Sequence, residues 1–173
     1  MDKDTTAPRT ASRGTRRKVY SMPEHTRTIA IDLGDKRTGL AMADSLTGIA
    51  SPAGMLGVSI SDHDGEALLG AIARAIEGLV GTGPADLVIG LPINMDGTEG
   101  PRAKLVRAYA ARIEAKTGRD VRFQDERQSS MAANERMAQS GLTHKQKKAR
   151  RDAIAAVVIL QRYLDAPGGQ VED

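Results

Sequence analysis

The sequence contains no cysteine, few aromatic residues and no long apolar run. Without cysteine, its 173 residues cannot form disulfides, thiolate zinc sites or thiol nucleophiles, so any metal must be held mainly by oxygen ligands. Aromatic residues make up only 2% of the chain, which argues against a platform that stacks many bases and leaves phosphate contacts and shape recognition. No apolar run approaches the roughly 20 residues of a membrane helix or forms a signal-peptide core. We therefore expect a cytoplasmic protein without membrane contact.

Positive charge is also scarce once the first residues are set aside. Residues 1–27 carry seven Lys and Arg against three acids, which accounts for more than the whole net charge of +3. These residues are nearly free of apolar side chains, and we expect 1–26 to be a disordered basic arm, 27–166 to be one folded domain and 167–173 to be a flexible tail. Inside the domain, cations cluster at Lys145, Lys147, Lys148, Arg150 and Arg151, with no acid among them. This basic run is a candidate phosphate-binding surface.

Hydrophobic periodicity predicts an α/β domain. Strands are expected at 28–33, 39–43, irregularly at 49–58, and at 86–91 and 121–125; helices are expected at 68–80, 101–117, 129–140 and 143–164. Pro52, Gly54 and Gly57 suit an edge position for the third strand. The order predicts a five-stranded mixed sheet, in which a three-strand antiparallel meander is continued by two parallel strands and flanked by helices. The first, fourth and fifth strands should open their carboxyl ends onto one crevice.

Three groups of acids are candidates for chemistry in that crevice. Asp32 lies inside the first strand on the face of Ala30, where a carboxylate is costly unless a charged partner compensates it, although it could simply stabilise the following turn. Asp125 and Glu126 end the last strand, where Arg127 could equally form a surface ion pair with one of them. Asp152 begins the apolar face of the last helix, and a solvated ion pair with a neighbouring cation is an equally good reading.

Together these acids have a chemical logic. Carboxylates from the first strand, the last strand and the last helix can converge on Mg²⁺ or Mn²⁺, which prefer oxygen ligands. Such a site could activate water for phosphoryl displacement. Beside Asp32, Lys36 and Arg37 could hold a phosphate in the predicted turn, or could be ordinary charged turn residues.

At this point the sequence resembles a known family. The segments Asp32-Leu-Gly34 with Lys36-Arg37-x-Gly39, then Gly90-Leu-Pro-Ile-Asn-Met-Asp-Gly-Thr-Glu-Gly-Pro-Arg102, Asp125-Glu-Arg127 and Asp152-Ala-Ile-Ala-Ala156 are similar to the successive motifs of the YqgF family. The resemblance runs from about Thr28 to Asp165, and the long central motif is its most specific part.

The resemblance implies a ribonuclease-H-like fold related to the RuvC-type Holliday junction resolvases. It implies a Mg²⁺- or Mn²⁺-dependent nuclease that matures the 5′ end of 16S ribosomal RNA or resolves DNA junctions, as a monomer or, for junctions, a two-fold homodimer. It assigns the metal and catalytic roles to Asp32, Glu126 and Asp152, and favours Glu126 over Asp125. Substrate contacts are expected at Lys36, Arg37, Asn94, Arg127, Lys145, Lys147, Lys148 and Arg151. Asp96 and Glu99, in the central loop with Asn94, should shape the site or contact substrate, or only hold the loop.

Two departures from the family pattern concern substrate positioning. Asp35 stands where the family usually has a small polar residue, and Gln128-Ser129 follows the arginine in place of Leu-Ser or Leu-Thr. Two other functions also remain open on the sequence: a nucleic-acid-binding protein without catalysis, and an actin-like phosphotransferase. The latter needs a second lobe for which this chain has no room.

Overall fold

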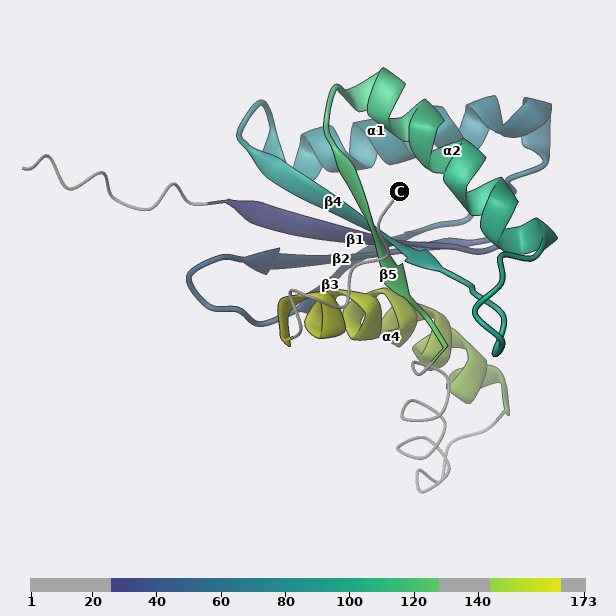
Figure 1. Cartoon of the computed structure of the whole chain (residues 1–173). Coiled ribbons are helices and arrows are strands. Elements are labelled where there is room, and N and C mark those ends of the chain that lie inside the picture. The colour runs from purple at the N-terminus through teal and green to yellow at the C-terminus, as the bar shows by residue number, and fades with distance from the viewer. Residues whose placement is uncertain (1–25, 128–143, 166–173) are drawn as a thin grey trace, which may run out of the picture.

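A five-stranded sheet lies between two layers of helices. The computed structural model describes residues 26–127 and 144–165, and in the last helix the side chains from Ile154 onwards. Its strands lie in the order β3-β2-β1-β4-β5. In Figure 1, α1 and α2 cover one face of the sheet, and α4 lies against the other. The predicted fold class, a mixed sheet flanked by helices, is confirmed.

The strands form the meander and the parallel extension that the sequence predicts. β1 (Arg27–Leu33), β2 (Thr38–Asp44) and β3 (Ser51–Leu56) pair antiparallel, whereas β4 (Ala85–Leu91) joins β1 and β5 (Val121–Asp125) joins β4 in parallel. β3 is an edge strand with a register shift opposite Leu40 and Ala41, as its proline and glycines predict. The carboxyl ends of β1, β4 and β5 therefore lie at the same edge of the sheet.

The helices begin and end close to the positions predicted from the sequence. α1 (Glu66–Val80) ends at Gly81, and α2 (Pro101–Thr117) begins with proline and ends at Gly118, whose φ of 66° is left-handed. The last helix, α4, spans His144–Asp165. The short helix η1 (Asp62–Gly65) was not predicted. His63 and Asp64 adopt positive φ angles there, a conformation that periodicity does not reveal.

The two faces of the sheet carry side chains of different size. Ile29, Ile31 and Leu33 belong to the larger core, which packs against α1 and α2. The face under α4 is lined by small residues, including Ala30, Ala41 and Ala43, which contact Ala156, Ile159 and Leu160 of α4. Small side chains let α4 lie close to the strands, and this is the face on which Asp32 falls by strand alternation.

Some of the predicted features lie outside the described residues. These are the arm up to residue 25, the helix at 129–140 and the tail after residue 165. Among the helices of the described ranges, none is long and apolar enough to cross a membrane.

Candidate active site

Asp32 and Glu126 lie at the same edge and on the same face of the sheet. Asp32 is two residues beyond Ala30 in β1 and opposite Gly39 of β2, so it faces α4. Glu126 directly follows β5, and its backbone N–H donates to the carbonyl of Leu91 at 3.2 Å, which continues the alignment with β4. Two carboxylates distant in sequence thereby lie on one face of the sheet, at the carboxyl ends of the two strands that flank β4.

Gly90 makes room for the Glu126 carboxylate. A Cβ placed on Gly90 would overlap Oε1 of Glu126, and would lie 2.8 Å from its Cδ and 2.6 Å from Cδ1 of Ile159 in α4. The side chain of Glu126 therefore occupies the space above β4 that any residue larger than glycine would fill. Ile159 bounds this space from the side of α4.

Burial and a neighbouring charge disfavour the ionised form of Glu126. The pKa of its carboxyl is raised to about 7, first by removal from water and second by the negative charge of Asp32. Arg102 lowers this pKa, and Asp125 raises it further. The influence of Asp32 shows that the two carboxylates lie close enough to repel each other, which a bound cation would relieve.

Asp125 has a different environment from Glu126. By strand alternation it falls on the opposite face of the sheet from Gln124 and Glu126, and its Oδ2 lies 2.5 Å from the guanidinium of Arg127. Burial tends to raise the pKa of Asp125, but hydrogen bonds from Arg127 and the charge of Arg127 outweigh it and hold the pKa below its usual value. The ion pair considered for this segment is therefore formed by Asp125 and Arg127.

Asp152 is placed by the backbone of α4 alone. It precedes Ala156 by one turn and Ile159 by two, and both of these residues are buried against the sheet. Helical spacing therefore puts position 152 on the sheet-facing side of α4. The structure does not describe the side chain of Asp152. The same holds for the predicted substrate-binding residues in the first two turns of α4, which are Lys145, Lys147, Lys148 and Arg151.

A hollow of about 460 Å³ adjoins Asp32. It is lined by the hairpin of β1 and β2 together with β3, through Asp32, Gly34, Asp35, Lys36, Arg37, Gly39 and Met55. The turn is narrow because the N–H of Gly34 donates to the carbonyl of Arg37 at 3.0 Å, and a side chain on Gly34 would overlap that oxygen. Lys36 and Arg37 thus line the same hollow as Asp32.

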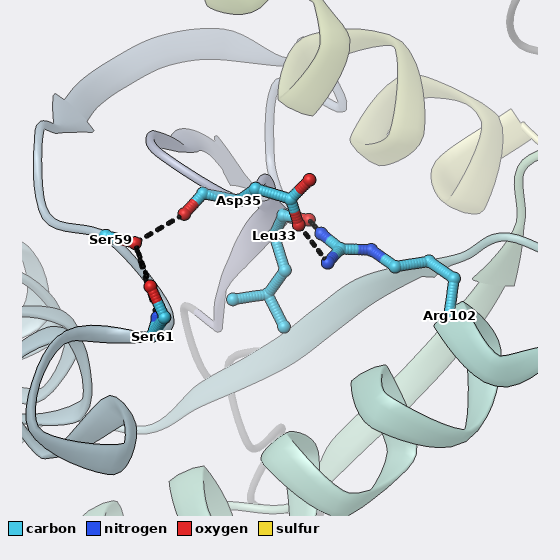
Figure 2. Close-up of polar contacts among 5 residues, drawn as sticks. All are labelled: Leu33, Asp35, Ser59, Ser61 and Arg102. Carbon is cyan, nitrogen blue, oxygen red and sulfur yellow. Dashed lines mark hydrogen bonds and ion pairs between the residues drawn. The ribbon is translucent and has the colours of Figure 1, made fainter.

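Sequence reasoning missed Arg102 as a site residue. Figure 2 shows its guanidinium, at the start of α2, between the carbonyl of Leu33 and the carboxylate of Asp35. The Arg102 Nη1 to Asp35 Oδ1 distance is 2.5 Å. The partners are 67 residues apart. Two sequence signals could have drawn attention to Arg102: its place at the end of the central motif, and the general rule that an unexpected acid needs a cation.

Gln124 is a second residue that the sequence did not single out. It is only 7% exposed, and within the described part of the chain its Oε1 has no hydrogen-bond partner. Gln124 pairs with Gly90 across the β4–β5 register and shares the face of Glu126. A buried amide oxygen without a partner is a group that an ordered water would satisfy.

The central loop after β4 is held by its own side chains. The Asn94 amide donates to Oγ1 of Thr98 at 3.0 Å, and Asp96 accepts from both the N–H and the hydroxyl of Thr98, which lowers the pKa of Asp96. Glu99 accepts from Nε of Arg107 in α2 at 2.8 Å. These contacts account for the three polar side chains as loop-shaping groups, and contact of Asn94 with substrate stays a prediction.

The donor set fits a hard divalent cation. Among the side chains that the structure describes, no three acids or histidines lie close enough together to hold a metal. The described part of the candidate site therefore supplies two acids, Asp32 and Glu126. All the candidate atoms are oxygens, as Mg²⁺ and Mn²⁺ prefer. The mutual repulsion of the two carboxylates is a feature that a bound cation would relieve.

The sheet order and the acids at its edge define a ribonuclease-H-like protein. A solved structure of Thermus thermophilus RuvC, in complex with a Holliday junction substrate, superposes with a TM-score of 0.51 at 14% identity. The match covers 84% of this chain and 98% of that one. At this identity the likeness concerns the fold, and it confirms the ribonuclease-H-like architecture.

The chain belongs to the RuvX family, whose model is described as Holliday junction resolvase and matches residues 26–166. A candidate pre-16S rRNA nuclease of Anaeromyxobacter dehalogenans is 41% identical over 139 residues, which are 80% of this chain and 96% of the relative. One of Paracoccus denitrificans is 38% identical over 84% of this chain and 87% of the relative. One of Chloroflexus aurantiacus is 35% identical, with 80% and 86% covered. The resemblance seen in the motifs is confirmed.

Proposed function

We propose that this protein is a divalent-metal-dependent endonuclease that hydrolyses phosphodiester bonds in structured nucleic acid. The observation that carries the proposal is the meeting of Asp32 and Glu126 at the carboxyl edge of β1 and β5, with Gly90 leaving the space for it. Family membership and the names of the relatives favour pre-16S ribosomal RNA, a Holliday junction, or both as substrates. The site lies in a chain that we expect to act in the cytoplasm.

Asp32 and Glu126 would hold Mg²⁺ or Mn²⁺, with Asp152 of α4 as the third acid. When bound, the cation supplies an activated water and stabilises the charge that develops on the leaving oxygen. Asp32 would contribute from a fixed strand position, and Glu126 from a half-buried position above Gly90. Partial burial strengthens the electrostatic interactions of Glu126, because fewer water molecules screen its charge.

The cations at the site would bind the phosphates of the substrate. Lys36 and Arg37 line the hollow beside Asp32 and would hold the phosphate backbone next to the bond that is cleaved. Arg127, already paired with Asp125, and the basic run in the first turns of α4 at Lys145, Lys147, Lys148 and Arg151 would hold flanking phosphates. Contacts of this kind position the substrate without reading its sequence.

Replacement of Asp32 tests the proposal directly. Asp32→Asn keeps the size of the side chain and removes its charge, so we expect loss of Mg²⁺-dependent cleavage by at least 100-fold, with folding and binding retained. Wild type and variant should be incubated with four-way DNA junctions and with precursor ribosomal RNA, in Mg²⁺ and in Mn²⁺. The products should be sized on denaturing gels, and circular dichroism should confirm the fold.

A matched control is Asp86→Asn. Asp86 lies in β4 on the same face of the sheet but at its opposite end, so this variant should cleave like wild type. Equal activity of Asp32→Asn and wild type would reject the mechanism. Binding of the substrates by wild-type protein without any cleavage would instead identify a non-catalytic binding protein.

A further inference from the structure

The end of β1 is held by contacts that do not come from the sheet. The parallel pairing of β1 with β4 extends only to Ile31 and Ile89, so Asp32 and Leu33 lie beyond it. There Arg102 of α2 donates to the carbonyl of Leu33, the residue next to Asp32. The guanidinium of Arg102 therefore takes the place of a strand neighbour on the side of β4.

The following turn is held from two sides, as Figure 2 shows. On one side, the carboxylate of Asp35 binds the same guanidinium of Arg102 at 2.5 Å. On the other, the backbone carbonyl of Asp35 accepts from the hydroxyl of Ser59 at 3.0 Å and from the N–H of Ile60 at 3.1 Å. Asp35 thus connects α2, the segment after β3 and the hairpin in which Lys36 and Arg37 lie.

These contacts contribute little to stability. The side chain of Asp35 is 81% exposed and that of Arg102 is 35% exposed, and ion pairs so open to water add little to the free energy of unfolding. Their geometric effect is larger, because Arg102 binds two groups of one turn with one planar fork. A misplacement of about 1 Å at a catalytic site can lower a rate by roughly 100-fold.

We propose that Arg102 is a positioning residue of the active site, and that Asp35 is the anchor that orients it. Through Leu33 and Asp35, Arg102 fixes the end of β1 and the hairpin turn, and so sets where Asp32 stands relative to Lys36 and Arg37. The inference deepens the proposed nuclease function and rests on it. It also gives a role to Asp35, the acid that departs from the family pattern.

The test uses a substitution that keeps the charge. In Arg102→Lys the ammonium stays positive but lacks the planar fork, so it cannot hold Leu33 and Asp35 as arginine does. We expect kcat to fall at least tenfold with KM changed less than threefold, at a temperature where the protein is fully folded. Asp35→Asn should lower kcat by a smaller factor, and should have no further effect when combined with Arg102→Lys.

Arg112→Lys is the matched control. Arg112 lies in the same helix and also binds one carbonyl, that of Asp64, and one carboxylate, that of Glu66, with similar side-chain exposures of 36% and 65%. It holds the η1 segment, which does not line the hollow beside Asp32, so Arg112→Lys should keep the wild-type kcat. If Arg102→Lys also keeps it, or if the two variants lose activity equally, Arg102 has no positioning role.

A second readout separates this inference from the proposed function. Calorimetric titration with Mn²⁺ should show binding weakened at least fivefold in Arg102→Lys and unchanged in Arg112→Lys, whether or not a substrate is cleaved. Absence of cleavage by wild type, with this difference in Mn²⁺ affinity, would reject the nuclease function and retain Arg102 as a positioning residue of the metal site. Equal Mn²⁺ affinity of wild type and both variants, without cleavage by wild type, would reject both.

Discussion

Gly90 is the residue at which the site has the least spare room. Gly90→Ala would bring a methyl group into overlap with Glu126 and to 2.6 Å from Ile159, so either the carboxylate or α4 must move. We expect the free energy of unfolding to fall by about 1–3 kcal/mol, as for other overpacked positions. Cleavage should fall at least tenfold. Urea unfolding and initial cleavage rates measure the two effects.

Gly78→Ala provides the control for this substitution. Gly78 lies inside α1, and a Cβ there meets no atom within 4 Å. The added methyl should raise the free energy of unfolding by about 0.5–1 kcal/mol through helix propensity, with cleavage unchanged. Wild-type activity of Gly90→Ala would show that Glu126 does not need its present position.

Tyr109 links stability to alkaline pH. Its buried hydroxyl donates to the carbonyl of Gly65 at 2.6 Å, and burial raises its pKa above the ordinary value of 10.0. A raised folded-state pKa means that this stabilisation is complete below about pH 10 and is lost as the pH rises towards the folded-state pKa. Tyr109→Phe should therefore unfold about 1 kcal/mol more readily at pH 7, and this deficit should shrink above pH 10.

Urea unfolding of both proteins from pH 7 to 11 measures this difference. Tyr163, whose pKa is also raised by burial, titrates in both proteins and cancels from the comparison. A deficit that stays constant over the whole range would contradict the prediction.

At the scale of residues, the sequence predicted that the acids of β1 and β5 lie at one edge of the sheet, and that Asp32 adjoins the cations of its own hairpin. Asp32, Lys36 and Arg37 adjoin one hollow because a tight turn joins two strands, and turn residues can be recognised locally. The contact of Arg102 with Asp35 and the space above Gly90 could not be predicted in this way. Both depend on how α2 and α4 pack on the sheet and on how β5 pairs with β4, which local patterns do not specify.

At the scale of elements, α2 contacts three separate segments of the chain, two of which adjoin the site. Three of its arginines, five residues apart, each bind a different segment: Arg102 the β1–β2 turn, Arg107 the end of the central loop through Glu99, and Arg112 the segment of η1. The position of α2 therefore constrains three segments of the chain at once.

The helices and strands themselves were largely predictable. β5 and α2 have the predicted bounds, because alternation, Pro101 and Gly118 are strong local signals. The segment η1 was missed because the left-handed conformations of His63 and Asp64 leave no trace in hydrophobic periodicity.

The small residues under α4 lead to a prediction for this layer. Ala41 of β2 is fully buried against α4, and Ala41→Leu would push the helix away from the sheet. We expect the free energy of unfolding to fall by about 1–3 kcal/mol. Cleavage should fall as well, because α4 contains Asp152. Differential scanning calorimetry and cleavage assays test this.

The neighbouring Met42→Leu is the control for Ala41→Leu. Met42 follows Ala41 in β2 and packs against the core on the other face of the sheet. Because Met and Leu have similar volumes, the free energy of unfolding should change by less than about 1.5 kcal/mol, and activity should be kept. Full activity of Ala41→Leu would show that the spacing of α4 does not matter for catalysis.

At the scale of the whole molecule, positive charge is concentrated in local clusters, and its excess over negative charge is small. The net charge is only +3, so nucleic-acid affinity has to come from local cations such as Lys36 and Arg37. For a duplex substrate, log affinity falls against log salt with a slope of roughly 0.9 per phosphate contact. The double variant Lys36→Gln with Arg37→Gln should therefore bind with a slope lower by about 1–2.

This slope can be measured by fluorescence anisotropy with a labelled junction at roughly 50 to 300 mM KCl, a range over which the screening of charges by salt changes strongly. The control is Arg74→Gln with Lys116→Gln, which removes two cations from α1 and from the end of α2, away from the hollow. The idea fails if both double variants change the slope equally.

The antiparallel course of β1 and β2 has a practical consequence for such measurements. It sends the loop of residues 45–50 to the end of the sheet remote from Asp32, and Leu46 is exposed there. Since the chain has no cysteine, Leu46→Cys would introduce its sole thiol. A dye coupled to that thiol would report tumbling and substrate capture by the native protein without occupying the surface that the substrate needs.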